Sequence, residues 1–307
     1  GSATQDIALD AFRIESAKAQ YQAALAASYQ TGYRLAMIWA GAGALWLAAR
    51  AETTTGVYLA EAWQFAYLCM ALSIGVGVVT TLLSPEPQSV LLPKARSAGQ
   101  WLQQTLIQPF ADFIGRYRWQ AFLILGLIAI YRISDVVMGI MANPFYVDMG
   151  YTKDEVAAIT KVFGVIMTLL GAFLGGLLTM RFGVMRVLFL GGVLSAASNL
   201  LFAWLSTRGH DLNGLVWVIS ADNLSSGIAS AAFIAYLSSL TNVQYSATQY
   251  ALFSSMMLLL PKWFAGFSGV YVDTFGYEHF FIATSLIGIP VLILITLAIR
   301  FEKSNSP

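Results

Sequence analysis

The sequence predicts an all-α membrane protein, and its composition and the length of its apolar runs support that prediction. Of 307 residues, 58% are hydrophobic and 11% are charged, whereas a soluble domain carries about 25% charged residues. The apolar residues gather in runs of roughly 20, the length with which an α-helix crosses the hydrocarbon core of a bilayer. Such runs lack the polar faces that a soluble helical protein needs, and they are too long and too uniform for barrel strands.

Seven runs are good candidate spans, at residues 33–50, 64–84, 119–142, 157–180, 184–206, 214–240 and 279–300. An eighth run, residues 247–272, is interrupted by Pro261 and Lys262. A ninth, residues 4–20, is polar on one side, so it would be stable in a membrane only against other helices or a wet cavity. We therefore expect about nine transmembrane helices.

Basic and acidic loops alternate, as a chain that crosses a membrane back and forth requires. The loops "AETTTGVYLAE", "VDMGYTKDE" and "VDTFGYEH" are acidic or nearly neutral. The basic residues lie in the 85–118 connection, the 181–186 turn and the C-terminal tail: Lys94, Arg96, Arg116, Arg118, Arg181, Arg186, Arg300 and Lys303. Since short cytoplasmic loops are rich in Lys and Arg, we expect the 85–118 connection and the C-terminus on the cytoplasmic side.

The 85–118 connection divides the chain. It contains Pro85, Pro87 and Pro93 and the amphipathic stretch "WLQQTLIQPFADFIG", which predicts a cytoplasmic linker with a surface-lying amphipathic helix. Residues 1–84 would form three helices, the C-terminal part of a first bundle, and residues 119–307 a second, six-helix bundle. Six helices after a basic central loop are typical of one half of a transporter built from two six-helix halves. On that count the first three helices are missing from this chain.

Several classes of protein are disfavoured. The single Cys69 excludes an intrachain disulfide framework and a Cys-based metal site, and His210 and His279 are too far apart to suggest a metal. A net charge of +1 gives no argument for a nucleic-acid partner. We find no G-x-S-x-G elbow, His-rich cluster or nucleotide-binding motif. We therefore expect neither an enzyme nor an ATP-driven pump, and no cofactor.

One turn supports the transporter class. Residues 175–186, "GGLLTMRFGVMR", have the form G-x-x-x-x-x-R-x-G-x-x-R between two spans. This turn resembles the second-half copy of the signature loop of the major facilitator superfamily. The alternative is a glycine-rich turn whose arginines only follow the positive-inside rule.

Seven strings resemble the AmpG-type muropeptide permeases of that superfamily, with spacing that matches the family from its fourth helix to its twelfth. They are "ATQDIALDAF" (3–12), "GYRLAM" (32–37), "SPEP" (84–87), "ITKVFG" (159–164), "ASNLLF" (197–202), "DNLSSG" (222–227) and "SATQYALFSS" (246–255). The family often has Glu where this chain has Asp222, and some members carry further helices after the twelfth. Acetyl-CoA transporters of the same superfamily, which carry another anionic metabolite, are the alternative.

The resemblance implies a multi-pass carrier of the bacterial inner membrane. Such carriers import anhydro-muropeptides, which are amphiphilic anionic products of cell-wall turnover, by proton symport. The expected partners are therefore the lipid bilayer, the muropeptide and protons, and we expect a monomer. Without its first three helices, the chain is not expected to transport alone.

Polar residues inside the predicted spans are the candidate site residues, because a charge at mid-bilayer costs about 2.5–3.5 kcal/mol on insertion scales unless it is paired or wet. The candidates for substrate binding or proton coupling are Asp6, Asp10, Arg132, Asp135, Lys161, Asp222, Asn223, Gln249 and Tyr250. In facilitator folds the fourth, seventh and tenth helices line the central cavity, so several of these residues would face it.

Three arrangements stand out, each with a structural alternative. Asp6 and Asp10 share a helix face, and close carboxylates favour binding of a proton; the alternative is an acidic helix start or a structural pair. Arg132 and Asp135 are three residues apart, so they either neutralise each other or form a pair that substrate or a proton opens. Asp222 has no basic residue within four positions, so its partner must come from another helix.

Lys161 is a candidate for binding the carboxylates of the substrate. Muropeptides are anionic through their peptide carboxylates, so cations in the cavity would be favourable. The lysine lies within the predicted span 157–180, where an unpaired charge is costly.

Overall fold

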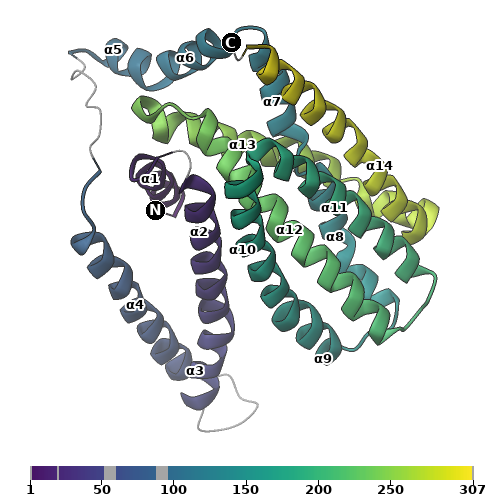
Figure 1. The fold of residues 1–307 in the computed structure, drawn as a ribbon. Coiled ribbons are helices and arrows are strands. Elements are labelled where there is room, and N and C mark those ends of the chain that lie inside the picture. The colour runs from purple at the N-terminus through teal and green to yellow at the C-terminus, as the bar shows by residue number, and fades with distance from the viewer. Residues whose placement is uncertain (1, 19–20, 52–59, 88–95, 306–307) are drawn as a thin grey trace. The chain divides into compact units, whose positions relative to one another are not determined.

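The computed structural model describes residues 2–18, 21–51, 60–87 and 96–305, without the side chains of residues 2, 3, 153, 154, 161 and 301–305 (Figure 1). All regular structure in that part is helical, which confirms the all-α prediction. Six described helices are long and apolar enough to cross a membrane: Ala60–Leu83, Gln120–Asp148, Ala157–Phe182, Val184–Ser206, Leu212–Leu240 and Ser268–Arg300. They match six of the seven good candidate spans of the sequence.

The other three predicted spans are helical but are not among those six. Residues 33–50 lie in one continuous helical stretch that runs through α2 (Gln22–Ile38), the π-helix η2 (Trp39–Gly43) and α3 (Ala44–Ala51). Of the polar run at residues 4–20, residues 4–15 lie in α1 (Ser2–Glu15), which ends there, and residues 19–20 lie outside the described residues. A membrane bundle is therefore shown, while nine spans remain a prediction.

The predicted span 247–272 is wrong at its C-terminal end. Helix α13 (Ser246–Ala265) stops earlier, and α14 (Ser268–Asn305) already includes the last five residues of that run. The chain bends again inside α14 at Gly276, which has φ +79°, a conformation that glycine adopts without steric cost. The sequence pattern missed the boundary because residues on both sides of it are equally apolar.

The chain forms two compact units, Gly1–Ala27 with Ser89–Pro307, and Ser28–Gln88. In the smaller unit, α3 packs against α4 (Ala60–Leu83). The buried residues of these helices are all alanines, Ala44, Ala48, Ala62 and Ala66. Small side chains let two helices approach closely, which is how helices associate in lipid.

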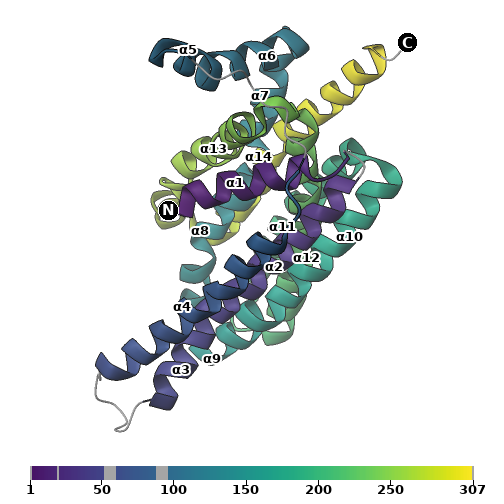
Figure 2. The same ribbon diagram turned by 90° about the vertical axis from the view of Figure 1, so that its left-hand side faces the viewer.

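The larger unit holds the remaining helices. They are α1, the start of α2 up to Ala27, α5 (Ala98–Leu102), η3 (Gln103–Ile107), α6 (Gln108–Tyr117), α7 (Gln120–Ile130), α8 (Ile133–Asp148), α9 (Lys153–Val156), η4 (Ala157–Phe163), α10 (Gly164–Phe182), α11 (Val184–Ser206), α12 (Leu212–Leu240), η5 (Val243–Tyr245), α13 and α14. Helix α12 packs against both α10 and α11, and all three run side by side in both ribbon views (Figures 1 and 2). α12 is therefore the central helix of this bundle.

Helices α10 and α12 approach so closely that they require glycine. A Cβ atom on Gly171 would lie 2.2 Å from the carbonyl oxygen of Leu224, and one on Gly227 would lie 2.3 Å from the carbonyl oxygen of Thr168. Backbone atoms cannot move aside as a flexible side chain can, so neither position accepts a larger residue without separating the helices. This contact places one side of α12 against α10.

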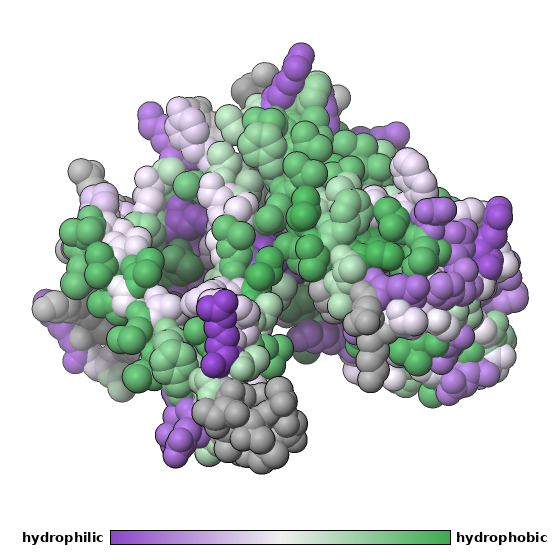
Figure 3. Space-filling model, turned by 90° about the horizontal axis from the view of Figure 1, so that it is seen from below, coloured by the Kyte–Doolittle hydropathy of each residue, from purple (hydrophilic) through white to green (hydrophobic). Residues whose placement is uncertain are grey.

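The outer surface is strongly apolar. Leu72, Val76, Leu82 and Leu83 on α4 are each more than 70% exposed. In the view from below, hydrophobic residues cover much of the visible face and hydrophilic residues gather in patches (Figure 3). A water-soluble protein rarely exposes such continuous apolar surface, whereas a lipid-facing helix requires it.

Polar contacts cap the N-terminus of α9, directly after the turn that follows α8. The backbone N–H of Thr152 donates to Glu155 Oε2 over 2.8 Å, and the N–H of Glu155 lies 3.3 Å from Thr152 Oγ1, a reciprocal capping box. His210 Nε2, from the turn before α12, lies 3.0 Å from the same carboxylate oxygen of Glu155. The hydrogen bonds from Thr152, followed by the contact with His210, lower the pKa of Glu155.

We expect Gly171→Ala to destabilise the protein by about 1–3 kcal/mol, because the added methyl group overpacks the contact between α10 and α12. The matched control is Gly139→Ala on α8, where a Cβ meets nothing within 4 Å. Thermal unfolding of the two purified variants in detergent measures the difference. Equal melting temperatures would show that α10 and α12 do not depend on this close approach.

Acidification should remove the contribution of Glu155 to stability. Because its pKa is lowered from the ordinary 4.5, the contribution is complete above that value and is lost as the pH falls through the lower, folded-state value. The melting temperature of Glu155→Gln should therefore be below that of the wild type at pH 7 and should approach it near pH 3. A difference that persists unchanged at acid pH would contradict the assignment.

Candidate functional site

The span Gln120–Asp148 is interrupted near its middle. α7 ends at Ile130, α8 begins at Ile133, and Arg132 between them has φ −91° and ψ 6°, outside helical geometry. The predicted span 119–142 is matched by this segment, and the break at Arg132 is a feature that the apolar pattern does not show. Non-helical backbone at membrane depth is tolerated only where protein or a wet cavity surrounds it, and it is a recurrent feature of transporter binding sites.

Arg132, at this break, is only partly satisfied. Its Nη1 donates to Ser230 Oγ of α12 over 2.9 Å, and its Nε lies 3.6 Å from Asp135 Oδ2. The Nε atom is buried and makes no hydrogen bond to any described residue. A guanidinium has five N–H donors, so Arg132 retains capacity for an anionic ligand.

Two serines on one turn of α11 hold two carboxylates. Ser195 Oγ donates to Asp135 Oδ1, and Ser198 Oγ lies 3.1 Å from Asp222 Oδ1 of α12. Ser198 Oγ also lies 2.9 Å from the carbonyl oxygen of Ser195. We call the six residues that α8, α11 and α12 bring together here the charged cluster: Arg132, Asp135, Ser195, Ser198, Asp222 and Ser230.

The charged cluster contains one cation and two carboxylates. Arg132 lies beside Asp135, and the side chains of this pair are 23% and 16% exposed, respectively. Asp222 has no ion pair among the described residues, and its hydrogen-bond partner there is Ser198. The sequence expectation that a partner of Asp222 comes from another helix is met by Ser198, but that partner is a hydroxyl group and not a cation.

Asn223 and Lys161 lie on the α10 side of α12. Thr168 Oγ1 of α10 donates to Asn223 Oδ1 over 2.9 Å, and Asn223 Nδ2 donates to the carbonyl of Ile219 in its own helix. Lys161 belongs to the π-helix η4, which continues directly into α10, but its side chain lies outside the described residues. π-Helical turns often occur at functional sites, so the π-helical backbone at Lys161 favours keeping this residue among the candidates.

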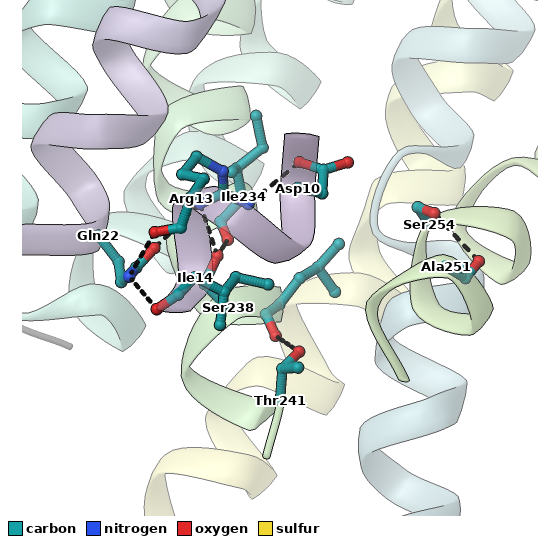
Figure 4. Close-up of polar contacts among 10 residues, drawn as sticks. Asp10, Arg13, Ile14, Gln22, Ile234, Ser238, Thr241, Ala251 and Ser254 are labelled. Atoms are coloured by element: carbon teal, nitrogen blue, oxygen red, sulfur yellow. Dashed lines mark hydrogen bonds and ion pairs between the residues drawn. The ribbon is translucent and has the colours of Figure 1, made fainter. Parts of the chain in front are cut away.

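Asp10 and Tyr250 belong to a second polar group, centred on Arg13 of α1. Arg13 lies 3.3 Å from Asp10 and donates to Ser238 of α12 over 2.9 Å (Figure 4). Its guanidinium also lies over the Tyr250 ring, 5.2 Å from the ring centre. Arg13 is 5% exposed, and these contacts pair its charge although its Nε makes no hydrogen bond to any described residue. Asp10 thus forms an ion pair with Arg13, while Asp6, one turn away on the same helix, is exposed.

All hydrogen-bonding positions of the Gln249 amide are filled by helix α6 and by Asn242. Its Nε2 donates to the Pro109 carbonyl over 2.8 Å and to Asp112 Oδ2 over 2.9 Å, both on α6. Its Oε1 accepts from Arg116 Nη2 and from the backbone N–H of Asn242. An amide has two donors and two acceptor positions, so Gln249 has none left for a ligand.

Sequence reasoning did not find Ser195, Ser198 and Ser230. Nothing in the local pattern separates them from other serines in the apolar helices, since a single hydroxyl is tolerated in a span wherever it bonds its own helix backbone. Only the positions of Asp135, Asp222 and Arg132 on neighbouring helices distinguish them.

Comparisons with known proteins give consistent relatives. No family model matches the chain. It is 33% identical over 295 residues to the transporter AmpG 4 of Rickettsia conorii, covering 96% of this chain and 69% of that protein. It is also 33% identical over 296 residues to the anhydromuropeptide permease of Escherichia coli K12, covering 57% of that protein. The chain belongs to the AmpG transporter family.

Proposed function

We propose that this protein imports anhydro-muropeptides across the bacterial inner membrane together with protons, as a cofactor-free, monomeric member of the major facilitator superfamily with its C-terminus in the cytoplasm. The name of the Escherichia coli relative supports the substrate class. The observation that carries the proposal is the charged cluster, in which Arg132, Asp135 and Asp222 meet at an interrupted membrane span.

The number of charged groups in the charged cluster indicates which carboxylate carries the proton. One guanidinium can neutralise one carboxylate, and Arg132 lies 3.6 Å from Asp135. Among the side chains that the structure describes, a second ionised carboxylate in this cluster would lack a cation, which is costly in the interior of a membrane bundle. Asp222, which accepts a hydrogen bond from the hydroxyl of Ser198, is therefore the residue to which we assign the proton.

Arg132 is the substrate-binding cation of the proposal. A peptide carboxylate of the muropeptide can accept two parallel hydrogen bonds from a guanidinium, and such charge-assisted pairs are strong. The long 3.6 Å contact with Asp135 and the unbonded Nε leave Arg132 able to exchange partners. When the substrate takes Arg132, Asp135 loses its cation, and the proton on Asp222 limits the excess of negative charge in the cluster, so binding of substrate and binding of a proton reinforce each other.

The remaining candidates support this arrangement in different ways. Lys161, at the start of the α10 span, is proposed as a further contact for substrate carboxylates, and Asn223 as the residue that holds α10 and α12 together beside the site. Asp6, Asp10, Gln249 and Tyr250 stay outside the proposed site. Asp10 and Tyr250 contact Arg13, Gln249 contacts the linker helix, and Asp6 is exposed.

The alternative substrate is another anionic metabolite, such as acetyl-CoA, because a guanidinium does not distinguish one carboxylate or phosphate from another. Competition separates the two. Uptake of labelled anhydro-muropeptide by the full-length protein should be reduced by unlabelled muropeptide and unaffected by excess acetyl-CoA.

Asp222→Asn should abolish proton-driven accumulation while leaving exchange intact. Asparagine resembles the protonated carboxyl but cannot release a proton, so substrate can cross only down its own gradient. In vesicles with an imposed pH gradient, we expect accumulation to fall at least about tenfold, since one pKa-tuned group typically controls that much rate. Counterflow of labelled against unlabelled substrate should persist.

The control for this change is Asp273→Asn on α14, an exposed carboxylate outside the charged cluster. It should accumulate substrate as the wild type does. Undiminished accumulation by Asp222→Asn, or accumulation by the wild type that a protonophore does not affect, would remove Asp222 or proton coupling from the mechanism.

The pair Arg132 and Asp135 is tested by single and double replacement. If the pair only neutralises itself, Arg132→Met with Asp135→Leu should leave transport intact, because a buried pair is often replaceable by apolar residues. If both residues act on substrate and proton, the double variant should be as inactive as each single one. We expect the second result, with uptake by Arg132→Met reduced about 100-fold or more through loss of a charge-assisted contact.

A further inference from the structure

Ser195 and Ser198 each hold one carboxylate of the charged cluster from a single turn of α11. We propose that they are positioning residues with separate tasks: Ser198 controls release of the proton from Asp222, and Ser195 keeps Asp135 facing Arg132. This inference rests on the proposed function, because it assigns the proton to Asp222 and the exchange of partners to Arg132.

The proposed role of Ser198 follows from its hydroxyl group, which has one hydrogen to donate and two oxygen atoms within reach. Its Oγ lies 3.1 Å from Asp222 Oδ1 and 2.9 Å from the carbonyl oxygen of Ser195, and both are acceptors when Asp222 is ionised. When Asp222 is protonated, its O–H can donate to Ser198 Oγ while the hydroxyl of Ser198 turns to the Ser195 carbonyl. Ser198 thus has a bond to offer in either state.

The hydrogen bonds that Ser198 makes in these two states differ in strength. A hydroxyl that donates to an ionised carboxylate makes a charge-assisted bond, which is roughly twice as strong as a bond between neutral groups. The bond from Ser198 to the Ser195 carbonyl in the protonated state adds little, because that carbonyl already accepts the backbone hydrogen bond of α11. Ser198 therefore favours the ionised form of Asp222 and eases loss of its proton. Removing the hydroxyl should make Asp222 hold its proton up to a higher pH.

Ser195 contacts a different carboxylate and has a different effect. Its hydroxyl donates to Oδ1 of Asp135, while Oδ2 of the same group faces Arg132 Nε at 3.6 Å. The serine thereby fixes the rotation of the carboxylate and keeps one oxygen toward the guanidinium. Without it, Asp135 no longer holds Arg132 in place for substrate, while the proton on Asp222 is unaffected.

The groups that act electrostatically on these carboxylates are contributed chiefly by the interrupted span. Tyr131 and Arg132 act on or beside Asp135, and Tyr146 and Asp135 act on Asp222. Lys161, near the start of α10, has its side chain outside the described residues. None of these residues is changed by the substitutions below, so their influence on the pH profile stays constant.

The test measures uptake of labelled anhydro-muropeptide by the full-length protein between pH 5 and 9. Ser198→Ala should raise the pH of half-maximal uptake by about one unit, which corresponds to loss of one hydrogen bond to a charged group, with KM within about twofold of wild type. Ser195→Ala should raise KM about tenfold, as for loss of one well-placed contact, and leave the pH midpoint unchanged. Ser198→Thr, which keeps the hydroxyl, should restore the wild-type profile.

The matched control is Ser225→Ala on α12, a buried serine whose hydroxyl donates to the carbonyl of Ala221 in its own helix. It should change neither parameter. If Ser198→Ala is poorly folded, Ser198→Cys, a weaker donor, should give an intermediate upward shift. Melting temperatures of all variants are measured alongside uptake, so that a loss of folded protein is not mistaken for a change in KM.

Several outcomes overturn the inference. An unchanged or lowered pH midpoint in Ser198→Ala removes the role of Ser198, and a shifted midpoint in Ser195→Ala removes the separation of tasks. If these results occur while Asp222→Asn still loses accumulation, only the roles of the serines fail. If Asp222→Asn accumulates substrate normally, the proton assignment of the proposed function fails, and this inference fails with it.

Discussion

A membrane interior offers no water to satisfy a charge or an open backbone, and that constraint governs the arrangement of every polar side chain in the larger unit. Arg13 and Arg132 are each held by side chains of their own segment and of another one. Arg13 contacts Asp10, Gln22 and Ser238, and Arg132 contacts Ser230 and Asp135. The two arginines differ in their exposure and in how closely their partners hold them. Arg13 is 5% exposed and closely held, whereas Arg132 stands at a break in its helix, has a loose ion pair and is 23% exposed.

Helix α12 joins the close packing of the bundle to the chemistry of the site. Neighbouring residues on a helix point about 100° apart, so Asp222 faces Ser198 of α11 while Asn223 faces Thr168 of α10. The glycines Gly171 and Gly227 bring α10 and α12 into backbone contact one turn beyond Asn223. The position of the Asp222 carboxyl therefore depends on contacts made by residues that carry no charge.

The contacts of helix α6 show how all hydrogen-bonding positions of a polar residue can be filled without that residue being part of a site. Gln249 and Asn242 bind Asp112 and Arg116 of α6, which fastens that helix to the turn between α12 and α13. An amide with four filled hydrogen-bonding positions stabilises structure and has nothing to offer a substrate. Arg132, with an unbonded and buried Nε, is the opposite case. An unbonded donor alone does not mark a site, because Nε of Arg13 is also buried and unbonded; the 3.6 Å ion pair and the 23% exposure of Arg132 separate it from Arg13, which is 5% exposed.

The sequence by itself determined the membrane class, six of the long apolar helices and the family, because hydrophobic length and local motifs are properties of short stretches of chain. It also identified Arg132, Asp135 and Asp222, since a charge in an apolar run is conspicuous. Only the tertiary structure decided that the helix breaks at Arg132, that α13 ends at Ala265, and that Gln249 is occupied by α6. The same holds for the serines of α11. Which hydroxyl faces which carboxylate depends on how three helices pack, and that packing is set by contacts between residues far apart in the chain.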